Sequence, residues 1–397
     1  MKKDLLIYLF SEAFVKLMPF VLLPYITKML GVDNFASLSI YRSYASILVV
    51  VLGLSAGGAI SRYYYKYSFK NINTLIYISN FWIIIFGVFF YIIAIFFGDI
   101  FLQMAVISAS MQGCLTACLS RYQASKNSRK YMAVQVVNVF ISTSITIILF
   151  ELYESSVLNR IYSLQFAIII AIIIALPKTK KIRITYLRFF KISKYILSYG
   201  FPLTISSIAL VLKGNIDRLI IENTISSQLL GSISLAMQLG ALLPMVYLIV
   251  NRAITPYVFE KFKFNLGSLN YFGFKQISVL VIISLTPFFT CLVIPNDYLL
   301  NIFGHGFIDI KYFLLSYLFS YSPQFLVIIL TWKFLYFSFN KYILISSFLS
   351  TAIHLLLVYI IIDYSVYGVP FVIFVSTLFQ VFLLVFFSSK VRKLDSK

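Results

Sequence analysis

Charged side chains inside long apolar segments are the residues of this sequence whose types and spacing suggest chemistry. The stretch "ALVLKGNIDRLII", residues 209–221, places Lys213, Asp217 and Arg218 among aliphatic residues. Each such charge costs about 2.5–3.5 kcal/mol at the centre of a bilayer on insertion scales. Side chains that are this costly to bury usually face a water-filled cavity or bind one another.

Cations outnumber acids within these apolar segments, which predicts a positively charged cavity for an anionic substrate. Arginine in particular matches the oxygens of a phosphate group. The candidate substrate-binding residues are Lys16, Lys28, Arg42, Lys213, Arg218 and Arg252. Lys28, and also Lys333, lie near the ends of their segments, where snorkelling of the ammonium group to the interface is the favoured interpretation.

Two acids accompany these cations and are the candidate ion-coupling residues. Glu12 lies four residues before Lys16, and Asp217 lies four residues after Lys213. Residues spaced by four share one face of a helix, so each acid and its lysine can form an ion pair. A purely structural role for the Lys213–Asp217 pair remains an equal alternative to a role in substrate or proton binding.

The composition is that of a polytopic helical membrane protein. Hydrophobic residues make up 61% of the 397 residues and charged residues only 12%, against about 25% charged in soluble proteins. Apolar runs such as "FWIIIFGVFFYIIAIFF" do not alternate with polar residues, which excludes a barrel and favours helices that bond their own backbone. The N-terminal segment is interpreted as a retained first span, because Glu12 and Lys16 interrupt it.

A length of about 20 residues per span predicts about twelve transmembrane helices. Lys and Arg are concentrated in alternate connections, which places both termini in the cytoplasm by the positive-inside rule and leaves Arg160 and Lys311 outside. The net charge of +20 is thus explained by topology and not by a nucleic-acid partner. The predicted spans are 5–30, 36–61, 74–97, 100–120, 131–150, 157–176, 196–221, 229–256, 274–295, 312–336, 341–362 and 367–388.

An internal repeat predicts two six-helix bundles that run in the same direction. At a constant offset of 195 residues, Gly31 aligns with Ser226, Ser39 with Ser234 and Lys66 with Lys261. Parallel repeats with a substrate site between them are typical of transporters. The predicted division is an N-terminal bundle 1–176, a basic cytoplasmic connector 177–195 that contacts membrane lipids, and a C-terminal bundle 196–397.

Two stretches resemble a known family. "LLPYITKMLGVDNFASLSIYRSYASILVVVLGLSAGGAISRYYYK" and "YGFPLTISSIALVLKGNIDRLIIENTISSQLLGSISLAMQLG" are similar to the O-antigen flippases (Wzx) of the multidrug/oligosaccharidyl-lipid/polysaccharide (MOP) exporter superfamily. The resemblance implies an all-α, MATE-like fold in the bacterial inner membrane. It also implies transport of undecaprenyl-diphosphate-linked O-antigen units by alternating access, with cavity cations binding the diphosphate.

The resemblance further implies a transporter and not an enzyme, with no cofactor. A proton or a sodium gradient is the candidate energy source, and a polysaccharide polymerase and a chain-length regulator are the candidate protein partners. The alternatives are another MOP exporter, for lipid II or for drugs, and an O-antigen polymerase or membrane glycosyltransferase. A drug exporter would be expected to carry acidic cavity residues, and an enzyme a large outer loop or clustered catalytic acids.

Overall fold

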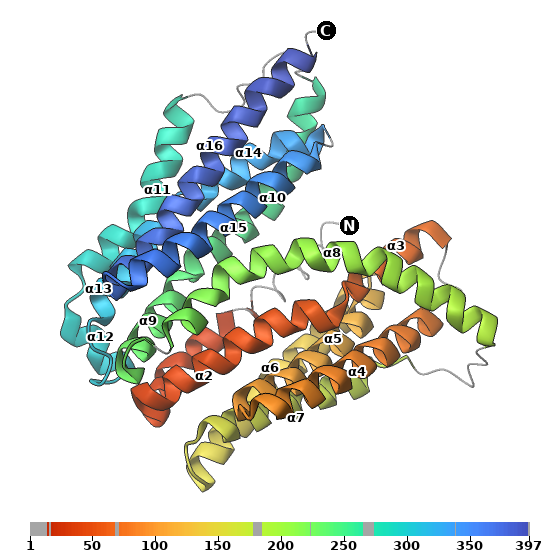
Figure 1. Ribbon diagram of the computed structural model, residues 1–397, viewed down its shortest axis with the longest axis horizontal. Helices are drawn as coiled ribbons and strands as arrows, with labels where there is room; N and C mark the ends of the chain where they lie inside the picture. The colour runs from red at the N-terminus through yellow and green to blue at the C-terminus, as the bar shows by residue number, and fades with distance from the viewer. Residues whose placement is uncertain are drawn as a thin grey trace. The chain divides into compact units, whose positions relative to one another are not determined.

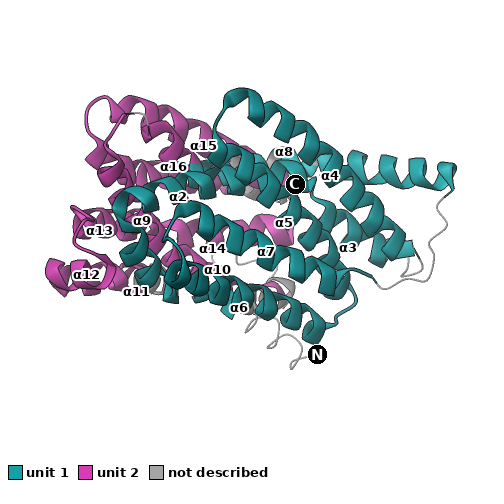
Figure 2. Cartoon of the chain, turned by 90° about the horizontal axis from the view of Figure 1, so that it is seen from below, with its two compact units in different colours: residues 1–215 teal, residues 216–397 magenta. Residues whose placement is uncertain are grey.

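The computed structural model describes residues 14–15, 17–67, 71–177, 185–222, 224–264, 274–337 and 339–395, and these contain helices and no strands. The chain divides into two compact units, residues 1–215 and 216–397, coloured separately in Figure 2. Helix α8 (Tyr186–Ile221) begins inside the predicted connector and belongs to unit 1 as far as Asn215. The predicted division into residues 1–176, 177–195 and 196–397 stays a prediction.

Unit 1 is organised around one central helix, α5. This helix packs against α2, α3, α4 and α7, while α6 packs mainly against α7 (Figure 1). Aliphatic side chains such as Leu75, Leu115 and Ile168 form the largest core of the unit. The helices before α8 are α2 (Leu23–Gly53), α3 (Ala56–Tyr67), α4 (Ile72–Phe97), α5 (Ile100–Ala124), α6 (Ser128–Leu152) and α7 (Val157–Ala175).

Short polar residues set the beginnings of these helices. The side chains of Asp99, Asn127 and Ser156 each accept a hydrogen bond from a backbone N–H in the first turn of α5, α6 and α7. Such caps satisfy backbone donors that the helix itself leaves free. The helices α5, α6 and α7 agree closely with the predicted spans 100–120, 131–150 and 157–176.

Helix α2 contains a sharp break at Gly31, where φ is 70° and ψ is 177°. This backbone conformation is accessible essentially only to glycine. The break separates the first predicted span from the second. Ser226, which the repeat aligns with Gly31, is the N-cap of α9 (Ser227–Gly240), so both aligned positions are helix breaks.

Replacing Gly31 by Ala is expected to lower the midpoint of thermal unfolding. No heavy atom lies within 4 Å of the position of the added Cβ, so the cost is backbone strain alone, about 1–3 kcal/mol. The matched control is Gly53→Ala in the same helix, which also has open space around its Cβ and gains helix propensity. Equal midpoints for the two purified variants in detergent would contradict the assignment of strain to Gly31.

Unit 2 has its own helical core. Helix α13 packs against α9 and α16, α15 packs against α16, and α10 packs against α14. Helices α11 and α12 meet at an angle of 89°, measured between 281–293 and 296–303. The remaining elements are α10 (Leu242–Phe264), α11 (Phe274–Val293), α12 (Asn296–Phe303), α13 (Ile310–Tyr321), α14 (Gln324–Tyr336), α15 (Asn340–Ile362), the short η2 (Val366–Gly368) and α16 (Val369–Asp395).

The protein is a multi-pass membrane protein. Within the described residues, nine helices are long and apolar enough to cross a bilayer, or ten if the bent pair α11–α12 is one span. This confirms the helical membrane class, whereas the count of twelve and the cytoplasmic location of both termini stay predictions.

Candidate functional site

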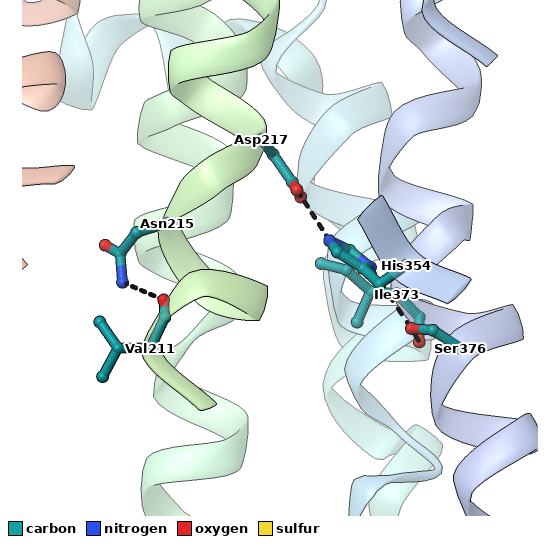
Figure 3. Close-up of polar contacts among 6 residues, drawn as sticks. All are labelled: Val211, Asn215, Asp217, His354, Ile373 and Ser376. Atoms are coloured by element: carbon teal, nitrogen blue, oxygen red, sulfur yellow. Dashed lines mark hydrogen bonds and ion pairs between the residues drawn. The ribbon is translucent and has the colours of Figure 1, made fainter. Parts of the chain in front are cut away.

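The most conspicuous polar contact of unit 2 joins Asp217, near the end of α8, to His354 in the middle of α15. The His354 Nε2 atom lies 2.7 Å from Asp217 Oδ1, and neither side chain is exposed. Figure 3 shows Asp217 pointing at the imidazole ring, with Ser376 of α16 on the other side of that ring. The partner of Asp217 is thus His354, 137 residues away, whereas the sequence analysis expected Lys213.

A hydroxyl group of α16 lies on the other side of the His354 ring. Ser376 Oγ donates to the carbonyl oxygen of Ile373 at 3.1 Å and lies 3.4 Å from His354 Nδ1. Each ring nitrogen of His354 therefore faces a polar partner, Nε2 the carboxylate of Asp217 and Nδ1 the hydroxyl of Ser376.

Further polar groups surround the pair in unit 2. Arg218 is buried and interacts electrostatically with Asp217 and with Tyr317 and Tyr321 of α13. Within the described residues, Asp217 Oδ2 and Tyr317 Oη are buried and have no hydrogen-bond partner. Unpaired polar atoms in an apolar interior are costly, so this cluster is more polar than packing requires.

In unit 1 the two predicted cations of α2 differ in their exposure to solvent. Lys28 is exposed. Arg42 is half-buried, with its guanidinium carbon 6.0 Å from the centroid of the Phe35 ring. Glu12 and Lys16 lie outside the described residues. Arg42 is therefore the cation from this helix whose position fits a partly enclosed anion site.

A second arginine of unit 1 is buried, although the sequence analysis placed it in an outer connection. Arg160 lies in the first turns of α7 and is 4% exposed. Its Nη1 atom donates to the Ser142 hydroxyl at 3.3 Å and also contacts Thr146 Oγ1 and Ser163 Oγ. Arg160 and Arg42 interact electrostatically as like charges. The hydroxyls of α6 and α7 explain why this cation is inside the unit and not outside.

The other predicted cations lie on α8, α10 and α14. Lys213 is half-buried, and the side chain of Arg252 lies outside the described residues. Lys333, which was expected to snorkel, is 8% exposed, and its Nζ donates to Ser388 Oγ at 3.0 Å. Lys333 is thus a packing contact between α14 and α16.

Sequence reasoning missed His354 and Arg160 for different reasons. A histidine surrounded by aliphatic residues in the middle of a span is itself a signal of an intramembrane partner, and Asp217 was the acid that needed one. Arg160 lies one turn after the predicted start of its span. Because span length alone does not fix the end of a helix to within one turn, it does not decide whether Arg160 lies inside or outside the membrane.

Comparison with known proteins identifies the family of this chain. A model of the family described as polysaccharide biosynthesis protein matches residues 1–262. An uncharacterised membrane protein of Haemophilus influenzae is 28% identical over 359 residues, which cover 89% of this chain and 88% of the relative. A second protein of that organism, named for its Lsg locus, is 28% identical over 402 residues and 98% of both chains.

Solved structures share the fold at low sequence identity. The lipid II flippase MurJ in an inward closed conformation has a TM-score of 0.75 at 12% identity, covering 96% of this chain and 87% of that one. An outward-facing multidrug resistance MATE transporter of the MOP superfamily has a TM-score of 0.60 at 14% identity, covering 100% and 97%. A MOP transporter from Pyrococcus furiosus, described as having a binding pocket of reversed polarity, has a TM-score of 0.59 at 12% identity, covering 100% and 97%. The chain therefore shares the fold of these solved transporters.

Proposed function

Because this chain belongs to the polysaccharide biosynthesis protein family, we propose that it is a flippase for lipid-linked oligosaccharides in the bacterial inner membrane. The observation that carries the proposal is the family match over residues 1–262 in a chain whose fold is shared with a lipid II flippase. The cargo is an undecaprenyl-diphosphate-linked repeat unit of O-antigen or a similar surface polysaccharide. The sugar crosses by alternating access while the lipid tail stays in the bilayer, and the exported unit then reaches a polymerase and its chain-length regulator.

Charge favours this cargo over the cationic drugs of a multidrug exporter with the same fold. A carrier of cations needs acids that face its cargo. The described part of unit 1 instead buries Arg160 and half-buries Arg42, and an anionic diphosphate suits such cations. Lipid II carries the same diphosphate as an O-antigen unit. The two cargoes are distinguished by which lipid-linked sugar accumulates when the gene is deleted.

Within the proposal, the diphosphate is bound by Arg42 and Arg252, with Lys213 and the lysines of the first span as further contributors. Arg218 has a different role, because it is buried beside Asp217, Tyr317 and Tyr321. It supports the ion-coupling site and does not contact the cargo.

The coupling ion in the proposal is a proton, and the pair Asp217–His354 holds it. With the proton bound the pair is neutral, and after it loses the proton the pair is negative. A buried uncompensated charge is costly, so proton release favours a conformation that hydrates the pair. Glu12 is the corresponding candidate of the first span and lies outside the described residues.

The proposal is tested by deleting the gene and extracting the lipid-linked sugars. Loss of the surface polysaccharide and accumulation of its undecaprenyl-diphosphate-linked repeat unit, identified by mass spectrometry, are the expected results, and re-expression should reverse both. Accumulation of lipid II instead would assign the protein to lipid II transport. Unchanged polysaccharide together with increased drug sensitivity would favour the multidrug exporter.

A further inference from the structure

Unit 1 contains a pocket of 340 Å³ among helices α3, α5 and α6. Its volume lies within the range of small-molecule sites, about 300–1,000 Å³. The polar side chains that line it include Ser61 of α3, Gln112, Thr116 and Gln123 of α5, and Tyr131 and Gln135 of α6. None of its described lining residues is charged, which distinguishes it from the predicted cationic sites.

The polar lining is arranged in stripes along two helices. Gln112, Thr116, Ser120 and Gln123 follow one another at spacings of four, four and three residues, which places them on one face of α5. On α6, Tyr131 and Gln135 line the pocket, and the same spacing continues to Asn138 and Ser142. Asn138 and Ser142 line a second cavity of 140 Å³, to which Gln112 and Arg160 also contribute. Polar side chains within membrane helices usually face the interior of the bundle or a water-filled cavity.

The amide groups in this pocket are available to a ligand. Within the described part of the chain, the side chains of Gln112, Gln123 and Gln135 form no hydrogen bond with the protein. Each amide offers two donors and one acceptor, and a sugar hydroxyl both donates and accepts. Gly57 and Gly58 line the pocket without side chains, and the half-buried ring of Tyr131 adds an apolar face. Uncharged amides, hydroxyls and one aromatic ring are the groups that recognise a neutral sugar.

Two arginines directly follow lining residues of the pocket. Arg62 follows Ser61, and its guanidinium carbon lies 4.7 Å from the centroid of the Tyr199 ring. Arg121 follows Ser120 and lies 5.6 Å from the Tyr122 ring centroid. Both arginines lie at the cytoplasmic end of the predicted topology, where the cargo enters. Consecutive residues of a helix point in different directions, so these two arginines do not line the pocket. The cation that shares a lining residue with it is Arg160, which lines the 140 Å³ cavity together with Gln112. A neutral pocket that shares Gln112 with a cavity containing a cation matches a ligand in which a sugar is joined to a diphosphate.

We infer that this pocket binds the sugar adjacent to the diphosphate of the lipid-linked cargo during loading from the cytoplasmic leaflet. The inference rests on the proposed function and adds to it a recognition site for the sugar. The uncharged lining favours neutral sugars, including N-acetylhexosamines, over acidic ones, because a carboxylate would find no cation among the lining residues.

The inference is tested by binding two lipids to the purified protein in detergent. One is undecaprenyl diphosphate, and the other is the same lipid carrying one N-acetylhexosamine. The wild-type protein is expected to bind the sugar-bearing lipid at least about tenfold more tightly. Gln112→Leu combined with Gln135→Leu should abolish this preference and leave the affinity for undecaprenyl diphosphate within about twofold, since each lost hydrogen bond contributes a several-fold factor. The matched control is Gln103→Leu, which is on α5 but outside the pocket.

The outcomes separate this inference from the proposed function. Binding of neither lipid by the wild-type protein would overturn the proposed function. Equal binding of both lipids by the wild-type protein, or an unchanged preference in the double variant, would overturn the sugar site alone.

A second measurement does not depend on the double variant. Cys114, Cys118 and Cys291 are buried, so a cysteine introduced by Gln135→Cys can be alkylated selectively by a maleimide. The sugar-bearing lipid should slow this reaction more than undecaprenyl diphosphate does at equal occupancy. Equal protection by the two lipids would overturn the inference.

Discussion

Asp217→Asn is expected to reduce export of lipid-linked sugar to background while the protein still inserts into the membrane. The substitution removes the carboxylate that lies 2.7 Å from His354. In the proposed mechanism this carboxylate and the imidazole together exchange the coupling proton. Breaking a buried pair also costs about 3–5 kcal/mol, so a lower midpoint of thermal unfolding should accompany the loss of export. Export measured in vesicles with an imposed proton gradient, beside thermal unfolding in detergent, checks both effects.

A double variant separates a proton-binding role from a purely structural one. Asp217→Leu with His354→Leu replaces the pair by apolar groups, which is often neutral or stabilising. The unfolding midpoint should therefore recover while export stays lost. Recovery of export in the double variant would show that the pair has a purely structural role. Arg42 and Arg252 would then be the remaining candidates for a role in transport.

The matched control for this experiment is Lys333→Met. It also removes a buried charged side chain from unit 2, one whose Nζ donates to Ser388 Oγ at 3.0 Å. No part of the proposed mechanism uses Lys333. Export is expected to continue in this variant. If Lys333→Met also abolished export, the loss of export in Asp217→Asn would reflect a general disturbance of the core of unit 2.

The helices of this protein could be predicted from sequence because the bilayer imposes strong local requirements on them. Long apolar runs, and the short polar residues Asp99, Asn127 and Ser156 that cap the helices after them, are visible in the sequence itself. The break at Gly31 was likewise indicated by the end of the first predicted span. Nothing in these local signals reports which helices touch one another.

The polar contacts could be predicted only in part, because they depend on tertiary structure. The i,i+4 spacing made Lys213 the obvious partner of Asp217, whereas the observed partner, His354, comes from a helix 137 residues later. Arg160 was placed outside because nothing in its own helix marks Ser142 and Thr146 of α6 as its hydrogen-bond partners. Sequence spacing thus indicated that Asp217 needs a partner but did not identify His354 as that partner.

Arg42→Ala is expected to reduce export of lipid-linked sugar by about 10- to 100-fold without preventing membrane insertion. In the proposed mechanism Arg42 binds the diphosphate, and a hydrogen bond to a charged group contributes about 1.5–3 kcal/mol. Arg42→Lys keeps the charge but loses the planar fork that binds two phosphate oxygens together, so it should recover only part of the export. Arg252→Ala should behave like Arg42→Ala if both residues hold the same diphosphate.

Lys130→Ala is the matched control, because Lys130 is an exposed cation of unit 1 at the start of α6 and has no part in the proposed site. If this variant lost as much export as Arg42→Ala, the effect would report on net charge and not on a specific contact. Affinity for undecaprenyl diphosphate supplies the second readout. Arg42→Ala should weaken that affinity by a factor similar to its loss of export, because the same contact carries both. Full export together with unchanged lipid affinity in Arg42→Ala would remove Arg42 from the diphosphate site, and the half-buried position of its guanidinium beside Phe35 would then be a packing feature of α2.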